Sequence, residues 1–196
     1  RKHGSSTQSN MRGNGFTGPG IDKAKGARIA ALLQERLIAL IDLQLTLKHV
    51  HWNVVGATFI GVHEMLDEEV VGVRKMVDET AERIATMGGE PNGLAGNLVA
   101  ARSWDDYSLN RATGPEHLGA LDLVYAGVIE SHRRALEELG DLDQVTQDMV
   151  IGQTRELEQY HWFVRAHLES AEGGLATEGA TTELAAAAQA RKRISR

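Results

Sequence analysis

Two pairs of residues with metal-binding side chains stand in one stretch of helix-forming sequence. His63 and Asp67 form the first pair, and Asp78 and Glu82 form the second, with a spacing of four in each. Because residues four apart lie one turn apart on the same helix face, each pair suits joint ligation of a single ion. Asp78 and Glu82 are also like charges, which a helix disfavours unless a cation or a partner offsets them. The stretch is therefore a candidate metal-binding helix.

The distance between the two pairs requires a second chain if they cooperate. His63 and Asp78 are 15 residues apart in the sequence, which is roughly 22 Å along a helix axis, so one ion cannot bridge both pairs within a chain. Two antiparallel copies of the helix, crossing near residues 72 and 73, would place each pair opposite the other pair of the partner. A two-fold dimer of this kind contains two identical sites.

His51 adds a further nitrogen ligand. It stands at the end of the preceding predicted helix, just before a short turn that brings the metal-binding helix alongside. Two imidazoles and three carboxylates, with no sulfur, suit ferrous and ferric iron, with manganese or zinc also able to bind. Simpler explanations exist for the residues taken singly, since Asp78 could pair with Arg74. Asp67 could be a solvated surface acid, and His51 could be a hydrogen-bonded core histidine.

A competing metal pattern occurs later in the chain. Glu158 and His161 have the Glu-x-x-His spacing of di-iron bundles, but such sites need the motif on two helices and a glutamate from each of the other two. The sequence contains no second copy. We therefore expect Glu158 and His161 to be surface or interface groups, and the adjacent Tyr160, Trp162 and Phe163 to be packing residues.

The elements that position these residues are all α-helical. The sequence predicts four long helices, over residues 22–55, 58–87, 113–140 and 143–170. Short turns join the first helix to the second and the third to the fourth, so each of these pairs should be an antiparallel hairpin. A long crossover over residues 88–113 lies between the hairpins, and its Leu94, Leu98 and Val99 could form a short extra helix. One long crossover in a four-helix bundle is the ferritin-like arrangement, and no strand pattern is visible.

Capping signals set the helix boundaries. Asp22 and Thr58 are the expected N-caps of the first two helices. The run Thr113-Gly-Pro-Glu116 has the spacing of a capping box with proline in the first turn. After Gly174 the chain becomes rich in alanine and threonine, and then basic, which predicts a mobile tail.

Composition limits the class of protein. The 196 residues fit one domain. Cysteine is absent, which excludes disulfides, thiol nucleophiles and iron–sulfur clusters and favours the cytoplasm. No apolar run approaches the roughly 18 residues of a membrane span, so no membrane association is expected. We expect a flexible basic arm over residues 1–21, a ferritin-like domain over 22–172 and a mobile tail with a basic end over 173–196.

Charge is unevenly distributed along the chain, whose net charge is −6. Residues 1–28 hold six lysines and arginines against Asp22 alone. The C-terminal end is also basic, through Arg191, Lys192, Arg193 and Arg196. Basic ends on an acidic body suit a soluble particle whose tails touch a polyanion, although the tails could instead be disordered segments that only keep the protein in solution.

Three segments of the chain resemble the signature of the Dps mini-ferritins, the DNA protection during starvation proteins. These segments are Lys48-His-Val-His51-Trp52-Asn53-Val-Val-Gly56, Phe59-Ile-Gly-Val-His63-Glu-Met-Leu-Asp67 and Asp78-Glu-Thr-Ala-Glu82-Arg83-Ile84. The likeness extends from about Ile21 to Ala171 and looks closest to actinobacterial members. The arm and the tail lie outside it.

This resemblance implies a hollow dodecamer of tetrahedral symmetry that oxidises ferrous iron and stores the ferric product as a mineral. It implies hydrogen peroxide as the preferred oxidant over dioxygen. By the same resemblance, the oxidation site takes ligands from two subunits related by a two-fold axis, and these fall on His51, His63, Asp67, Asp78 and Glu82. Acidic pores on three-fold axes would admit iron, and Asp148 with Asp143 nearby is the best match.

Two other functions remain compatible with the residues. The first is an architectural nucleoid protein that binds DNA and whose metal site is vestigial. The second is a metal-dependent hydrolase that uses the same ligands to activate water. Nothing in the sequence specifies a pocket for an organic substrate, which places the hydrolase below the other two.

Overall fold

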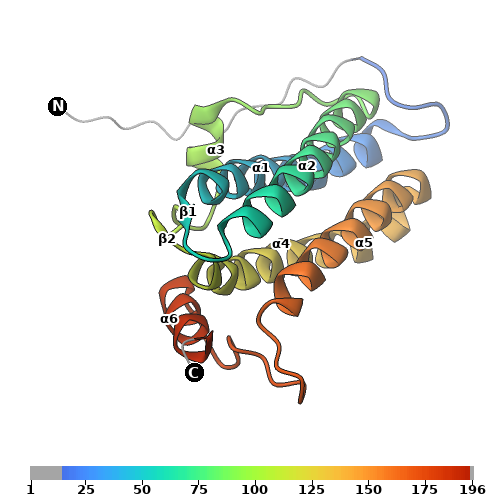
Figure 1. Ribbon diagram of the computed structural model, residues 1–196. Helices are drawn as coiled ribbons and strands as arrows, with labels where there is room; N and C mark the ends of the chain where they lie inside the picture. Colours follow the sequence, from blue (N-terminus) through green and yellow to red (C-terminus); the bar gives the residue numbers. More distant parts are fainter. Residues whose placement is uncertain (1–14, 195–196) are drawn as a thin grey trace.

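The computed structural model describes residues 15–194. It consists of a four-helix bundle, a short helix in the long crossover, and a C-terminal helix beside the bundle (Figure 1). The helices of the bundle are α1 (Lys23–Asn53), α2 (Phe59–Thr86), α4 (Gly114–Leu142) and α5 (Gln144–Ala166). The remaining elements are the short helix α3 (Ala95–Ala101), two short strands, β1 (Val54–Val55) and β2 (Ala112–Thr113), and the helix α6 (Glu183–Ile194). The predicted all-α, ferritin-like order of two hairpins and one long crossover is confirmed.

Local capping explains where two of the long helices begin. The side chain of Asp22 accepts a hydrogen bond of 2.9 Å from the backbone N–H of Lys25, as an N-cap should. At the start of α4, the backbone N–H of Thr113 donates to the Glu116 carboxylate over 3.0 Å and the Thr113 hydroxyl donates over 2.6 Å, so the capping box is present. Thr58 occupies the N-cap position of α2, but its side chain makes no capping bond.

The structure also contains two short strands. Val54 and Val55 form a two-residue parallel ladder with Ala112 and Thr113. A ladder this short has no visible alternation in the sequence, which explains why no pattern indicated it. The ladder joins the end of the crossover to the turn between α1 and α2 by hydrogen bonds. Gly56 completes this turn with a φ of +95°, a conformation that favours glycine.

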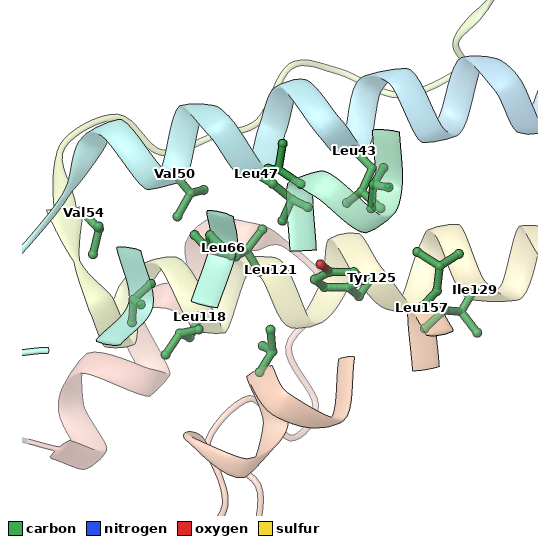
Figure 2. Packing of buried hydrophobic residues seen from close by; sticks show 14 of the residues in the cluster. Leu43, Leu47, Val50, Val54, Leu66, Leu118, Leu121, Tyr125, Ile129 and Leu157 are labelled. Carbon is green, nitrogen blue, oxygen red and sulfur yellow. The ribbon is translucent and has the colours of Figure 1, made fainter. Parts of the chain in front are cut away.

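The core lies along the axis of the bundle and draws on all four long helices. Figure 2 shows Leu47 of α1, Leu66 of α2, Leu121 and Tyr125 of α4 and Leu157 of α5 converging there, and all are almost completely buried. Burying each such side chain contributes about 1.5–3 kcal/mol. The core therefore holds α1 and α2 in a fixed register, which is what a site built on both helices needs.

The C-terminal segment differs from the predicted mobile tail over residues 173–196. The helix α6 packs against α4, with Ala186 and Ala190 fully buried (Figure 1). A Cβ added to Gly119 of α4 would lie only 2.7 Å from the Ala186 carbonyl oxygen. The two helices thus approach closely because small residues face each other, and this fit cannot be recognised from an alanine-rich composition.

Gly119→Ala is therefore expected to loosen α6. The added methyl group has no space, and overpacking of this kind costs about 1–3 kcal/mol. Hydrogen exchange of the α6 amides, followed by mass spectrometry, should become faster. The matched control is Gly127→Ala on the same helix, where an added Cβ meets nothing within 4 Å. Equal protection of α6 in both variants would contradict the close fit at Gly119.

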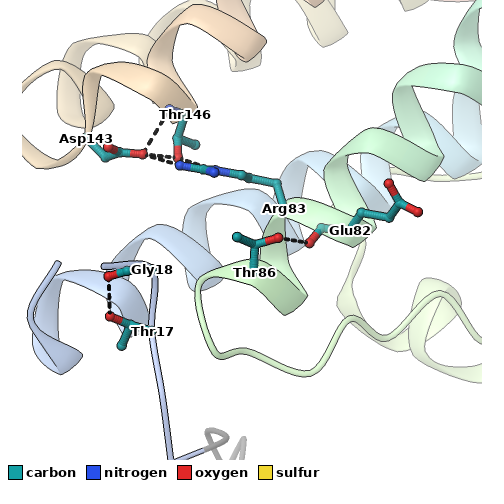
Figure 3. Close-up of polar contacts among 7 residues, drawn as sticks. All are labelled: Thr17, Gly18, Glu82, Arg83, Thr86, Asp143 and Thr146. Atoms are coloured by element: carbon teal, nitrogen blue, oxygen red, sulfur yellow. Dashed lines mark hydrogen bonds and ion pairs between the residues drawn. The ribbon is translucent and has the colours of Figure 1, made fainter. Parts of the chain in front are cut away.

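The basic arm predicted over residues 1–21 is partly structured. The hydroxyl of Thr17 donates to the backbone carbonyl of Ile21 over 2.5 Å, and Thr17 also contacts Gly18 (Figure 3). Ile21 packs against the hydrophobic cluster at this end of the bundle. Residues 1–14 lie outside the described part of the chain. None of the helices between residues 15 and 194 combines the length and apolar character that a membrane crossing needs.

Candidate metal centre

His51, His63 and Asp67 meet at one end of the α1–α2 hairpin. His51 lies near the C-terminal end of α1, and the turn that follows brings His63 and Asp67 of α2 beside it. One possible ligand atom from each of the three residues lies within 4.8 Å of the others. The two imidazole rings stack with centroids 3.6 Å apart. The structure thus brings together the three residues that the sequence placed on two separate helices.

Each imidazole is oriented by the backbone of the other histidine. Nδ1 of His51 lies 2.9 Å from the carbonyl oxygen of His63, and Nδ1 of His63 lies 2.9 Å from the carbonyl oxygen of His51. When Nδ1–H donates to a carbonyl, the other ring nitrogen keeps its lone pair free for a metal ion. The reciprocal bonds therefore leave two Nε2 atoms as ligands.

Asp67 shares its carboxylate with Lys48 of α1. The Lys48 ammonium donates to Asp67 Oδ1, and Nδ1 of His51 lies 3.6 Å from the same oxygen. The hydrogen bond from Lys48 lowers the pKa of Asp67, with a smaller contribution from the two histidines. The carboxylate is thus held ionised and half-exposed at the mouth of the cluster. The sequence contained Lys48 within the quoted motif, but its contact with Asp67 was missed.

Asp78 and Glu82 lie farther along α2, exposed to solvent. Within residues 15–194 neither carboxylate has an ion pair or a side-chain hydrogen bond, so the alternative pairing of Asp78 with Arg74 does not occur there. Figure 3 shows the Glu82 side chain pointing away from the neighbouring Arg83, which contacts α5. The like charges of this second pair are therefore not offset by any side chain in the described part of the same chain.

Large apolar side chains are exposed next to His51 and along α2. Trp52 is 71% exposed beside His51, and Ile60 and Val71 of α2 are 58% and 69% exposed. Trp52 is not part of the core of this chain. Exposed apolar residues gathered around a ligand cluster are typical of a surface that another protein chain covers.

Glu158 and His161 do not form a metal site. Glu158 pairs with Arg133 at the surface, as expected of a surface group. His161 is different from the prediction because it is largely buried, and its Nε2 lies 2.7 Å from Oδ1 of Asp122. The two side chains are thus committed to different partners. Asp122 was not a candidate at all, although it interrupts an apolar run of α4.

The two proposed pore residues differ in what their carboxylates do. Asp143 caps α5 by accepting from Thr146 and forms a 2.7 Å ion pair with Arg83 (Figure 3). Burial alone would raise the pKa of Asp143, but these bonds outweigh it and lower the pKa. Asp143 is therefore engaged within its own subunit. Asp148, one turn later, is exposed, and no residue in the described range pairs with it.

The predicted DNA-binding residues lie on the last turn of α6 and beyond it. Arg191, Lys192 and Arg193 are exposed on α6. Nη1 of Arg191 lies 3.4 Å from the Glu116 carboxylate, while Arg196 lies outside the described residues. The three described cations are thus presented by a docked helix.

Known proteins similar to this chain share its fold and most of its length. Residues 30–173 match the model of the ferritin-like domain family. The chain is 56% identical over 178 residues to the DNA protection during starvation protein of Mycolicibacterium smegmatis, a match covering 91% of this chain and 97% of that protein. It is 52% identical over 159 residues to the fine tangled pili major subunit of Haemophilus ducreyi, covering 81% and 84% of the two chains.

Solved structures give the same result. The structure of Mycobacterium smegmatis Dps superposes with a TM-score of 0.84 at 57% identity and covers 85% of this chain and 95% of that chain. A Dps from Streptomyces coelicolor gives a TM-score of 0.82 at 58% identity, with coverages of 84% and 98%. Both matches cover more than four fifths of this chain.

Proposed function

Because the chain belongs to the Dps family of ferritin-like proteins, we propose that it oxidises ferrous iron at centres shared between two subunits. In this proposal, twelve subunits form a hollow shell that stores the ferric product and protects DNA from oxidative damage. The observation that carries the proposal is the cluster of His51, His63 and Asp67, with ligand atoms within 4.8 Å. The unpaired carboxylates of Asp78 and Glu82 supply what this cluster lacks when a partner presents them.

The chemistry follows from the types of ligand. Neutral imidazoles and carboxylates bind ferrous iron, and the negative charge of the carboxylates favours the more highly charged ferric product. Two ferrous ions each give one electron to one molecule of hydrogen peroxide, whose oxygen–oxygen bond breaks, and with two protons its oxygen atoms leave as two molecules of water. Hydrolysis of the ferric ions then releases protons. Both reagents that generate hydroxyl radicals are consumed in this reaction.

Stopped-flow measurement of iron oxidation, on material sized by light scattering, tests this proposal. We expect the ferrous ions to be consumed faster with hydrogen peroxide than with an equal concentration of dioxygen, and only by assembled protein. An architectural role with a vestigial site predicts no protein-dependent oxidation with either oxidant. A hydrolase would instead cleave an amide or ester under anaerobic conditions without any change in the iron.

Removal of Lys48 is expected to tighten metal binding. Its ammonium occupies the carboxylate of Asp67, so an arriving cation must displace it. Since an ion pair that is partly exposed is worth up to about 1 kcal/mol, Lys48→Gln should raise the affinity a few-fold. Anaerobic titration with ferrous iron, or with zinc as a redox-inert probe, measures the change.

The matched control for this variant is Lys75→Gln. Lys75 forms an exposed ion pair with Glu79 on α2, at 3.6 Å, but neither residue belongs to the cluster. Its loss should leave the affinity for the metal unchanged. Weaker binding by Lys48→Gln would show that Lys48 orients Asp67 instead of competing with the metal.

We also propose that the basic end of the chain binds DNA without reading its sequence. Arg191, Lys192 and Arg193 on α6, with Arg196 beyond it, supply four positive charges per subunit. One such cluster binds weakly, but twelve copies on one shell gain affinity through multivalency. Deleting residues 191–196 should abolish binding to duplex DNA while iron oxidation remains. Unchanged DNA binding after this deletion would assign the contact to another surface.

A further inference from the structure

A cavity of about 530 Å³ between α1 and α4 has an excess of arginine and no role in the proposed iron chemistry. Three arginines line it, Arg28 and Arg36 of α1 and Arg134 of α4, against two glutamates, Glu35 and Glu138; Trp104 and Ser131 line it as well. Arg36 precedes His51 by 15 residues on the same helix, so the cavity lies roughly 22 Å along α1 from the metal cluster. The cavity is therefore distinct from the cluster of His51, His63 and Asp67.

Arg36 is a cation whose charge is poorly compensated. Its residue is only 7% exposed, and its Nε has no hydrogen-bond partner among the described residues. One terminal nitrogen donates to the carbonyl of Ser131, and the other lies 3.3 Å from the Glu35 carboxylate, which is 67% exposed. Burial lowers the pKa of Arg36. A buried guanidinium in this position is stabilised by an additional anion.

Arg134 increases this need for negative charge. The guanidinium of Arg134 acts on Arg36 as a repelling positive charge, and within residues 15–194 Arg134 has no ion pair of its own. His132 contributes no charge, because burial and then the nearby Arg36 lower its pKa to about 4. The third arginine, Arg28, is already paired with Glu138. The unmatched charge is thus concentrated on Arg36 and Arg134.

We infer that this cavity binds a phosphate-type oxyanion between Arg36 and Arg134. Guanidinium groups make charge-assisted hydrogen bonds to such an anion. The exposed guanidinium of Arg134 is available to donate these bonds, and Arg36 adds its positive charge from the facing helix. The Ser131 hydroxyl at the cavity wall is a further donor of the right kind. Free phosphate and the phosphate of a nucleic-acid backbone share this chemistry.

Titration of the assembled full-length protein with inorganic phosphate, in chloride buffer and followed by calorimetry, tests the inference. Arg134→Gln should weaken phosphate binding about tenfold or more, since a charge-assisted hydrogen bond is worth about 1.5–3 kcal/mol. Arg134 is exposed, so the variant should fold. The matched control is the adjacent Arg133→Gln, which loses only the surface pair with Glu158 and should bind phosphate normally.

A second arm identifies the source of the phosphate. If the cavity takes a DNA phosphate, Arg134→Gln reduces the slope of log affinity for duplex DNA against log salt concentration by about one. Inorganic phosphate then also competes with DNA. If it takes the free anion, DNA binding is the same in Arg134→Gln and Arg133→Gln. Equal loss of phosphate binding in the two variants, or no binding by the unmodified protein at millimolar phosphate, would overturn the inference.

Discussion

Coexpression of two inactive variants, His63→Ala and Asp78→Ala, is expected to restore about a quarter of the wild-type rate of iron oxidation. Each variant alone should lose about 100-fold or more, because loss of even an indirect partner of a metal ligand costs about 10- to 100-fold. In a mixed two-fold pair, one site carries both defects and the other carries neither. Half of the randomly formed pairs are mixed, and each has one intact site of two.

The control for this experiment uses two defects on the same side of the shared site. Coexpression of His63→Ala with Asp67→Ala leaves no intact site in any pair, since both residues come from the same chain of each centre. The initial rate of ferrous loss with hydrogen peroxide, normalised to the number of subunits, gives the comparison. If both mixtures are equally inactive, Asp78 of one chain does not complete the site of another chain, and the iron centre proposed above is wrong.

The two residue pairs of the proposed shared centre could be recognised in the sequence because their signals are local. The spacing of His63 and Asp67, and of Asp78 and Glu82, depends only on helix geometry, and the distance between the pairs follows from the rise per residue. The same is true of the capping box at Thr113, which correctly marked the start of the third long helix. Such features need no knowledge of what packs against the helix.

The errors concern residues whose partners are distant in the sequence. The docking of α6 depends on Gly119, which precedes Ala186 by 67 residues and matters only because it has no side chain. The contact between Lys48 and Asp67 required the exact alignment of two helices. Asp122 left one usable signal, a charge within the apolar run of α4, because a charge there must find partners from other elements.

Replacement of Asp122 is expected to be the most destabilising change outside the apolar core. Its carboxylate is almost completely buried and accepts from His161, Arg165 and Thr177, over 2.7, 2.8 and 2.5 Å. These donors come from α5 and from the segment that leads to α6. Burial alone would raise the pKa of Asp122, but the three hydrogen bonds together lower it. Since the folded pKa lies below the unfolded one, this stabilisation is complete at neutral pH and is lost only in strong acid.

Asp122→Ala should therefore lower the free energy of unfolding by about 3 kcal/mol, the lower end for breaking a buried ion pair, because half-exposed Arg165 can turn to solvent. In a chain of this length the melting temperature should fall by about 6 to 12 °C. Asp122→Asn keeps the shape of the side chain, so its melting temperature should lie between those of Asp122→Ala and the unmodified protein. Glu158→Gln, which breaks only a surface pair, should change the melting temperature little. Equal melting of Asp122→Ala and Glu158→Gln would mean that this network does not join the C-terminal segment to the bundle.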